Sequence, residues 1–308
     1  MPARLSIHVP GQPVLLRIVD DDCSARLGRD PTGDIVIAHD SVSRLHARIA
    51  EVDGAWMISD LGSKNGIRVD GERVVEARLD RGCWFALGDV FCEFEPIDAA
   101  ARAHLESRDA ERRSTSRAWA ARIEQRGRTD ELIADLLRGI VEIAECERGF
   151  LLTFDADERL VMRACHALVP DDIAGPSFSG SRGAVERTLL HRRPVFSSDQ
   201  RDHAWLGAQA SVIARGLRAI ACLPLQHGGE LLGVVYADSG DEAKEFTELD
   251  AELLGAFVDR ASTALAITML DEQIRGMSSL LAVDANDSRS IGLAPAWPVT
   301  PTITGRRA

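Results

Sequence analysis

Three short polar clusters in the first quarter of the chain carry side chains that could bind or transform a charged ligand. They are Gly28-Arg29, Ser43-Arg44-Leu45-His46 and Ser63-Lys64-Asn65-Gly66. Taken alone, the hydroxyl of Ser43 and the imidazole of His46 would suit a hydrolase fragment, a metal-ligand pair or a phosphate-binding loop. The same residues would also suit an ordinary turn that leads into a strand.

The donors in the first two clusters match the needs of a phosphate group. A phosphate dianion offers three strong acceptor oxygens and therefore requires donors. Arg29 supplies a planar, permanently charged guanidinium, Ser43 a short hydroxyl donor and Arg44 a second positive charge. Alone, Arg29 would be a solvated surface arginine and Ser43 a turn hydroxyl, so the prediction of phosphate binding rests on the set.

The third cluster adds further hydrogen-bonding groups beside these donors. Ser63 supplies a hydroxyl and Lys64 an ammonium group that can close over a bound phosphate. Asn65 carries both a donor and an acceptor for an extended peptide backbone, although Asn65-Gly66 alone is a common hairpin turn. His46 begins a predicted strand, which favours a structural role over a catalytic one.

The strands and turns predicted around these clusters place all three at strand–loop junctions. Short apolar runs at close spacing indicate strands at 14–20, 34–38, 47–52, 55–61 and 67–71. Turns rich in Gly and Asp separate the runs, a pattern typical of an all-β sandwich or barrel over residues 1–98. Binding residues concentrate in loops that such a scaffold holds.

The ordered set, on this strand-rich background, resembles the forkhead-associated (FHA) family. The resemblance covers about residues 4–98 and rests on Gly-Arg, then Ser-x-x-His, then a turn ending in Asn-Gly. It implies a β-sandwich that binds phosphothreonine peptides through loops at one end. It also implies core ligand contacts from Arg29, Ser43 and Asn65, neighbouring contacts from Arg44, Ser63 and Lys64, and structural support from Gly28, His46 and Gly66.

Two departures from the family pattern concern the preference for peptide side chains. Ile67 follows Asn65-Gly66, where the family often has threonine. The run 79–82, Leu-Asp-Arg-Gly, is followed by Cys83, whereas the family often shows Leu-x-x-Gly-Asp; Leu87-Gly88-Asp89 comes soon after. Neither departure removes a predicted phosphate ligand.

The rest of the chain predicts a linker and a mixed domain. Residues 99–129 are rich in Ala, Arg and Glu and are predicted to form a helical, basic linker, either solvated or packed on a partner copy. A helix and then strands are predicted at 130–145, 148–155, 159–167, 219–227 and 231–238. A long helix follows from Glu248, with Thr247 and Asp250 as a capping box. This order predicts an α+β domain with an antiparallel sheet.

The course of residues 130–270 resembles the GAF family. The segments 194–202, 217–238 and 246–266 are similar to that family's loop, central hairpin and closing helix. The resemblance implies a module that senses a small ligand or dimerises. The Asn-Lys-x-Phe-Asp-Glu pattern of cyclic-nucleotide GAF domains is missing from the sequence, so no cofactor is expected. Residues 271–308 are predicted as a helix extension and a disordered tail.

Composition and missing motifs exclude several classes of protein. The net charge of −12 argues against a general nucleic-acid binder. No run of ~18 apolar residues and no apolar signal region is present, so no membrane contact is expected. The 6 cysteines form no C-x-x-C pair and suggest reduced thiols in the cytoplasm. Without a P-loop, H-E-x-x-H, G-x-S-x-G or kinase motif, we expect no enzyme, no catalytic residue and no metal site.

Two hypotheses of different classes follow from the sequence. In the first, the FHA half binds a threonine-phosphorylated protein or kinase in bacterial signalling downstream of Ser/Thr kinases, with transcriptional regulation as one setting. The GAF half then dimerises the chain, binds a small ligand, or both. In the second, the protein is a GAF-based small-molecule sensor or GAF-type enzyme, and the FHA half is only a scaffold.

Overall fold

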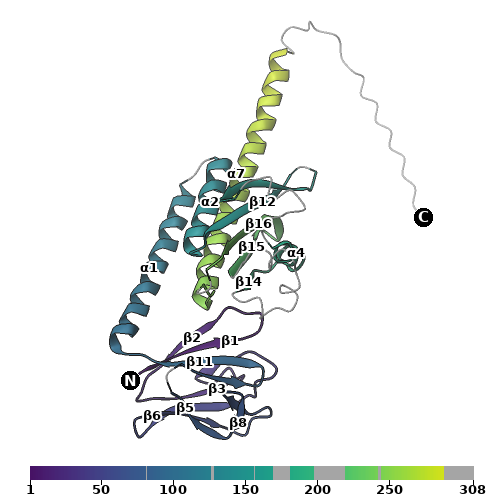
Figure 1. Ribbon diagram of the computed structural model, residues 1–308. Helices are drawn as coiled ribbons and strands as arrows, with labels where there is room; N and C mark the ends of the chain where they lie inside the picture. Colours follow the sequence, from purple (N-terminus) through teal and green to yellow (C-terminus); the bar gives the residue numbers. More distant parts are fainter. Residues whose placement is uncertain are drawn as a thin grey trace, which may run out of the picture. The chain divides into compact units, whose positions relative to one another are not determined.

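The computed structural model describes residues 1–80, 82–125, 128–155, 157–168, 181–197, 219–241 and 244–287, with the side chains of these residues up to Arg275. Residues Met1–Ala266 form one compact unit and Ile267–Ala308 a second. The first unit contains a strand-rich sandwich followed by helices and a further antiparallel sheet, shown in Figure 1. The predicted fold class, an all-β sandwich followed by an α+β domain, is therefore confirmed.

The N-terminal sandwich consists of two sheets. The first has the order β2-β1-β11-β10-β7-β8, formed by Leu15–Val19, Ala3–His8, Val90–Pro96, Cys83–Leu87, Ile67–Val69 and Glu72–Val74. The second has the order β4-β3-β5-β6-β9, formed by Ile35–Val36, Ser24–Gly28, Ala47–Val52, Ala55–Asp60 and Glu76–Arg78. The described strands pair antiparallel, except for the parallel pair of β3 and β4.

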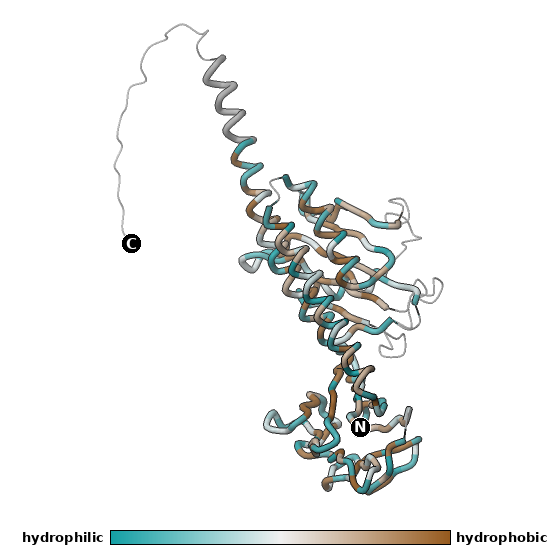
Figure 2. Tube along the Cα trace, turned by 90° about the vertical axis from the view of Figure 1, so that its left-hand side faces the viewer, coloured by the Kyte–Doolittle hydropathy of each residue, from teal (hydrophilic) through white to brown (hydrophobic). Residues whose placement is uncertain are grey.

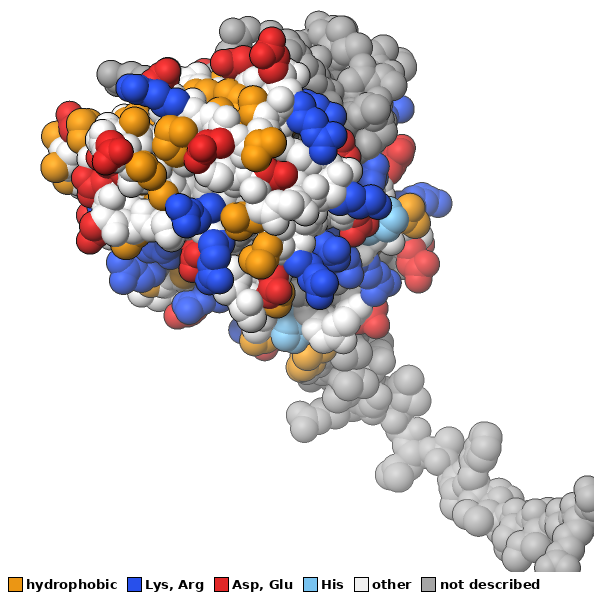
Figure 3. Space-filling view, turned by 90° about the horizontal axis from the view of Figure 1, so that it is seen from below, with side chains coloured by type: hydrophobic (Ala, Val, Ile, Leu, Met, Phe, Trp, Pro, Cys, Tyr) orange, Lys and Arg blue, Asp and Glu red, His pale blue; other side chains and the backbone are white. Residues whose placement is uncertain are grey.

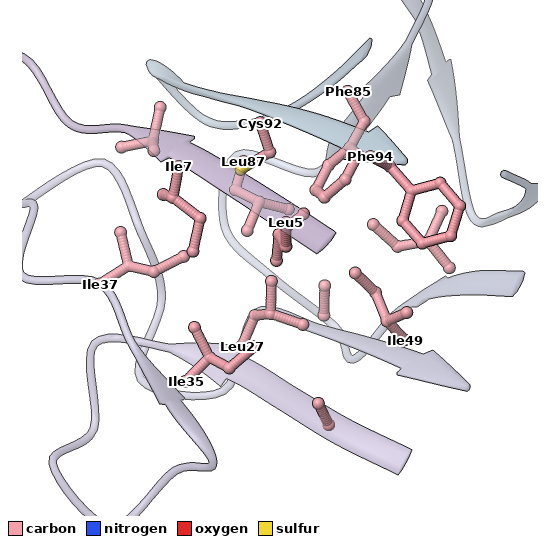
Figure 4. Packing of buried hydrophobic residues seen from close by; sticks show 14 of the residues in the cluster. Leu5, Ile7, Leu27, Ile35, Ile37, Ile49, Phe85, Leu87, Cys92 and Phe94 are labelled. Carbon is pink, nitrogen blue, oxygen red and sulfur yellow. The ribbon is translucent and has the colours of Figure 1, made fainter. Parts of the chain in front are cut away.

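The sandwich core follows from the two-residue alternation of the strands. On β1 and β11, Leu5 lies opposite Phe94 and Ile7 opposite Cys92, and all four side chains are buried. Figure 4 shows them pointing toward Leu27 and other aliphatic side chains of the facing sheet. Each such buried side chain contributes ~1.5–3 kcal/mol, which fixes the strands and with them the loops at their ends.

The C-terminal domain is built on one antiparallel sheet with the order β13-β12-β16-β15-β14. Its strands are Leu160–His166, Arg148–Phe154, Glu230–Ser239, Ala219–His227 and Val195–Ser197. Helix α2 (Thr129–Ile143) packs on one face, where a Cβ at Gly149 would lie 3.2 Å from Leu137 Cδ1. Helix α4 (Arg182–His191) packs on the other face, where Ala184 joins the core cluster that contains Phe150. The sheet is therefore covered on both sides.

Helix α1 (Ala99–Glu124) occupies most of the predicted linker and packs at its C-terminal end. Asp98 caps the helix, accepting a hydrogen bond from the Ala101 amide at 2.7 Å. Trp119 and Ile123 are buried near α2, where a Cβ at Gly139 would lie 3.2 Å from the Trp119 ring. This end of the helix is therefore part of the folded domain and is not solvated.

Four basic side chains of α1 are paired with acids of the C-terminal domain, whereas Arg102 is paired with Asp20 of the sandwich. The ion pairs are Arg108 with Glu145, Arg112 with Asp250, Arg113 with Glu252, and Arg122 with Asp135. The local positive excess of the linker is thus neutralised by the acidic domain that follows it. Charge complementarity between the two segments explains how a basic stretch exists in a chain of net charge −12.

Helix α7 (Glu248–Asp287) begins at the predicted capping box. The amide of Thr247 donates to Asp250 Oδ2 at 2.7 Å, and the amide of Asp250 donates to Thr247 Oγ1 at 3.3 Å. Asp therefore performs the role that Glu or Gln usually has at this position. Figure 2 shows hydrophobic and hydrophilic residues interspersed along the described part of this helix.

By length and composition alone, the segment Glu248–Arg275 of α7 could cross a membrane. The sequence-based expectation overlooked it because charged residues interrupt its apolar positions. Leu254, Phe257 and Ala261 of this segment are buried within the domain, and the core helix of a folded domain passes the same test. The criterion is therefore weak support for a membrane span.

Candidate phosphate-binding site

The first two polar clusters lie side by side in adjoining loops of the sandwich. Gly28 ends β3, and the amide of Arg29 donates to the carbonyl of Ser43 at 2.9 Å. The amide of Asp30 donates to the carbonyl of Arg44 at 3.1 Å, and Arg29 Nε donates to the carbonyl of Val42 at 3.3 Å. The side chains of Arg29 and Arg44 are both exposed, so their guanidinium groups are available at the surface.

Gly28 is required by the close approach of these loops. A Cβ at this position would lie 2.1 Å from the carbonyl oxygen of Arg44, well inside van der Waals contact. Any other residue would push the Ser43 loop away from β3. The Gly-Arg pair is therefore explained by a backbone contact, which supports the structural role that the family resemblance implies.

The hydroxyl of Ser43 joins the second cluster to the third. The amide of Lys64 donates to Ser43 Oγ at 2.9 Å. A hydroxyl has two acceptor lone pairs and one proton, so Ser43 can hold Lys64 in place and still donate its proton to an anion. The Lys64 side chain is exposed. The geometry thus brings Ser43 and Lys64 together across a sequence separation of 21 residues.

His46 is a buried support between the three clusters. Its side chain is 0% exposed, and Nδ1 accepts a hydrogen bond from the Ser43 amide at 3.1 Å. Nε2 lies 3.1 Å from the carbonyl oxygen of Gly66, and because a carbonyl only accepts, Nε2 carries the proton. With both nitrogens engaged by the backbone, His46 has no position from which to act on a ligand.

The third cluster is a turn closed by its own side chains. The amide of Ser63 donates to Asp60 Oδ1 at 3.1 Å, and the amide of Gly66 donates to Ser63 Oγ at 2.8 Å. Gly66 has a φ of 75°, in the left-handed region that favours glycine. Ser63 thus shapes the turn, and its hydroxyl proton is the part that can reach a ligand.

Asn65 holds a second loop residue that the sequence did not single out. Asn65 Nδ2 donates to the carbonyl of Ser41 at 2.7 Å, so one of its donors is used within the protein. Ser41 Oγ accepts from the Asp89 amide at 2.9 Å and lies 2.8 Å from His39 Nδ1. A Cβ at Gly88 would lie 2.6 Å from the Ser41 carbonyl oxygen. The Gly88-Asp89 pair, noticed in the sequence only as a departure in spacing, therefore positions the loop around Ser41.

The charge of the site is positive. Arg29, Arg44 and Lys64 are exposed on the joined loops. The nearby carboxylate of Asp30 accepts hydrogen bonds from the amide and the hydroxyl of Thr32. Hydrogen bonds from the Thr32 amide and hydroxyl, with a smaller effect from Arg44, lower the pKa of Asp30. Figure 3, viewed from below Figure 1, shows Lys and Arg side chains dispersed among hydrophobic and acidic ones on the face that it draws. Three cations and several donors on rigid loops suit a dianion.

The fold and the site agree with the comparison to known families. Residues 25–88 match the model of the FHA domain, and residues 128–266 match the model of a GAF domain. The chain therefore contains an FHA domain followed by a GAF domain. Domains of both families are typically non-catalytic, and neither model is that of an enzyme.

Solved structures of FHA domains resemble the N-terminal part of the chain. The FHA domain of the CT664 protein from Chlamydia trachomatis is 29% identical, with a TM-score of 0.30, and the match covers 32% of this chain and 100% of that one. The FHA-1 domain of Rv1747 from Mycobacterium tuberculosis is 26% identical, with a TM-score of 0.27 and coverages of 31% and 97%. EmbR of the same organism, solved with a low-affinity phosphopeptide, is 28% identical, with a TM-score of 0.26 and coverages of 30% and 24%. The comparison with curated proteins gives no match.

The GAF sheet carries a buried polar group on its α4 face. Asp238 is 0% exposed and accepts a hydrogen bond from Arg148 Nε at 2.8 Å, and an interaction with the Tyr236 hydroxyl also favours its charged form. Burial raises the pKa of Asp238, and the opposing effect of Arg148 is smaller. Tyr236 lies two residues away, stacked on Phe150 at 4.6 Å. Residues 169–180 and 198–218, which include part of the predicted GAF loop at 194–202, lie outside the described residues.

Two cysteines of the GAF domain, Cys146 and Cys222, are packed as neutral thiols. Burial raises the pKa of Cys222 to about 12 and that of Cys146 to about 12. A thiolate is the reactive form of cysteine, so these two side chains are poor nucleophiles at neutral pH. Within the described residues, no group of three or more His, Cys, Asp or Glu side chains is arranged to hold a metal ion.

Proposed function

We propose that the protein is a bacterial, cytoplasmic signalling adaptor whose FHA domain binds a threonine-phosphorylated protein downstream of a Ser/Thr kinase. The observation that carries the proposal is the joined loop pair of Ser43 and Lys64. The Lys64 amide is fixed on Ser43 Oγ at 2.9 Å, and the Ser43 carbonyl accepts from the Arg29 amide at 2.9 Å, so Ser43 joins the loops that carry the exposed Arg29 and Lys64. His46 and Asn65 hold both loops from behind, so the donors are in place before a ligand arrives.

Binding of phosphopeptides tests the proposal directly. Charge-assisted hydrogen bonds contribute ~1.5–3 kcal/mol each, so Arg29→Ala should weaken binding of a phosphothreonine peptide library about 10- to 100-fold. Fluorescence anisotropy of the full chain measures this, with the unphosphorylated library as a blank. Arg48→Ala, which removes another exposed arginine from strand β5, is the matched control and should bind as the wild type does. Equal binding by Arg29→Ala and the wild type would contradict the proposal.

The GAF domain is proposed to dimerise the chain. Ile267, Leu270 and Ile274 form an apolar stripe on α7 with exposed fractions of 61%, 57% and 48%. Their spacing of three and four residues places them on one side of the helix. Contiguous exposed apolar residues of this kind mark an interaction site, and a second α7 offers the matching stripe. Two copies would then present two FHA domains to one phosphorylated partner.

A sensor role for the GAF domain is the second candidate. Its support is the buried carboxyl of Asp238, whose pKa is raised by burial, because buried ionisable groups with shifted pKa values cluster at binding sites. Native mass spectrometry of the purified chain would detect a ligand that remains bound. A mass equal to the bare chain, with no thermal shift on adding nucleotides or metabolites, would count against this role. The raised thiol pKa values of Cys146 and Cys222 disfavour the version in which the domain is a thiol-based enzyme.

A further inference from the structure

Helices α1 and α7 lie side by side and leave between them a groove of about 490 Å³. Arg113 of α1 pairs with Glu252 of α7 at 3.0 Å. Glu124, at the end of α1, pairs with Arg260 at 3.3 Å, so the two helices run in the same direction. The volume of the groove falls within the ~300–1,000 Å³ that is typical of pockets for small-molecule ligands.

The floor of the groove consists of small and aliphatic side chains because the large rings of the two helices point inward. A Cβ at Gly139 of α2 would lie 2.5 Å from the Phe257 ring and 3.2 Å from the Trp119 ring, so both rings pack toward α2. Helix faces that meet through short side chains leave space along their seam. The small and aliphatic residues that line this space are Ser116, Ala120, Ala121, Leu253 and Ala256.

One positive charge in the groove has no acidic partner. The charged residues of the lining are Arg113, Arg117, Glu124, Glu252 and Arg260. All of them except Arg117 belong to the ion pairs at the two ends. Arg117 Nε donates to the carbonyl of Arg113 at 3.2 Å, and Arg117 forms no ion pair within the part of the chain that the structure describes. The terminal nitrogens of its exposed guanidinium therefore remain available as donors.

We propose that this groove binds a small amphipathic monoanion, whose apolar body lies on the floor and whose carboxylate pairs with Arg117. A guanidinium can pair with a carboxylate through two parallel hydrogen bonds, which the terminal nitrogens of Arg117 permit. Glu124 and Glu252 at the ends would repel further negative charge, so a single charge suits the groove better than the phosphates of a nucleotide. The site goes beyond the proposed function, because it involves neither the phosphate-binding loops nor Asp238.

The closed ends of the groove favour this occupant over a second copy of the chain. Arg113 and Glu124 are 11 residues apart, which corresponds to ~16 Å along α1 and suits a short acyl chain or a pair of rings. A helix of a second copy would extend past both ends and would displace the ion pairs there. A stable interface between two copies would also need a much larger buried area.

Calorimetric titration of the full chain with octanoate and with octan-1-ol tests the proposal. The wild type should bind octanoate about tenfold more tightly than the uncharged alcohol, since a charge-assisted hydrogen bond contributes about that factor. Arg117→Gln should remove this preference by weakening octanoate binding about tenfold. Ala256→Leu places a larger side chain on the floor and should weaken the binding of both molecules.

Matched variants control for charge and for volume. Arg193→Gln removes the same charge from an exposed arginine that follows α4, and Ala118→Leu enlarges an exposed alanine of α1 outside the lining. Both should bind octanoate as the wild type does, and so should Arg29→Ala, which separates this site from phosphothreonine binding. A wild type that does not bind octanoate, or that binds it no better than Arg117→Gln does, would overturn the proposal. A change of oligomeric mass in Ala256→Leu would assign the groove to a second copy and would overturn it as well.

Discussion

At the scale of single residues, the candidate phosphate site separates into side chains that are exposed to solvent and side chains that hold the loops. Arg29, Arg44 and Lys64 are exposed, whereas His46 is buried and bonded to backbone at both nitrogens. The spacing of Ser43 and His46, which suggests catalysis in the sequence, is thus explained by the hydrogen bonds through which His46 supports two loops. Asn65 belongs to both groups. Its amide nitrogen donates to the Ser41 carbonyl, and its amide oxygen can accept a hydrogen bond from a peptide.

Replacement of His46 measures the value of this support. His46→Ala would leave the Ser43 amide and the Gly66 carbonyl without their partners, at a cost of ~1–3 kcal/mol for each buried group. We expect the free energy of unfolding to fall by about 2–5 kcal/mol in urea titrations of the full chain. His39→Ala, at a partly exposed histidine of the same region, should cost less. Equal costs for the two variants would show that His46 is not the central support.

At the scale of elements, helix α1 is tied to the GAF domain by a buried ion pair. Arg112 is 12% exposed and bonds to Asp250, whose side chain is 1% exposed and also caps α7. Lys244 lies 3.7 Å from the same carboxylate, and Glu145 lies 3.8 Å from Arg112. One buried carboxylate thus both starts the last helix and anchors the first. This connection joins α1 to the domain together with the buried Trp119 and Ile123.

Removing one partner of this pair should be much more harmful than removing an exposed one. Arg112→Ala leaves Asp250 with less compensation in a buried position, and we expect a loss of about 3 kcal/mol in the free energy of unfolding. Arg108→Ala, whose exposed side chain pairs with Glu145 at 2.9 Å, should cost ~0–1 kcal/mol. Chemical denaturation of both variants at neutral pH measures the difference. Similar midpoints would mean that α1 is held by Trp119 and Ile123 rather than by charge.

At the scale of the whole molecule, the FHA domain is proposed to recognise the partner, and the GAF domain is proposed to bring two copies of the chain together. The apolar stripe of Ile267, Leu270 and Ile274 belongs to the second compact unit and is described by its exposure alone. Dimerisation through it would make binding bivalent and therefore tighter for a multiply phosphorylated partner.

A charge placed in the stripe tests the dimer. Light scattering of the wild type should give twice the chain mass of 33.5 kDa, and Leu270→Glu should give a single chain mass, because a buried unpaired carboxylate is costly. Gln273→Glu adds the same charge at an exposed residue beside the stripe and should remain dimeric. A wild type of single chain mass would exclude this part of the proposal.

The sequence by itself determined the fold class and the inventory of the site. Two-residue alternation, helical periodicity and the Thr247 and Asp250 cap are local patterns, and burial selects for them directly. Gly28 and Arg29, Ser43 and Asn65 could likewise be identified from residue types and their order. The domain boundaries and the roles of these residues remain predictions, since neither has been tested.

Only the tertiary structure decided which hydrogen-bond donors of the site bond within the protein and which residues surround them. Ser41 is bonded to Asn65 across 24 positions and to Asp89 across 48, and no local pattern encodes contacts between such distant loops. The hollow in the outer face of the first FHA sheet, which Trp84 lines, depends on strand register in the same way, because Ala86 lies opposite Phe91 and Arg68. Sequence patterns report which face of an element is buried, whereas pairing between elements is fixed by the packing of the whole domain.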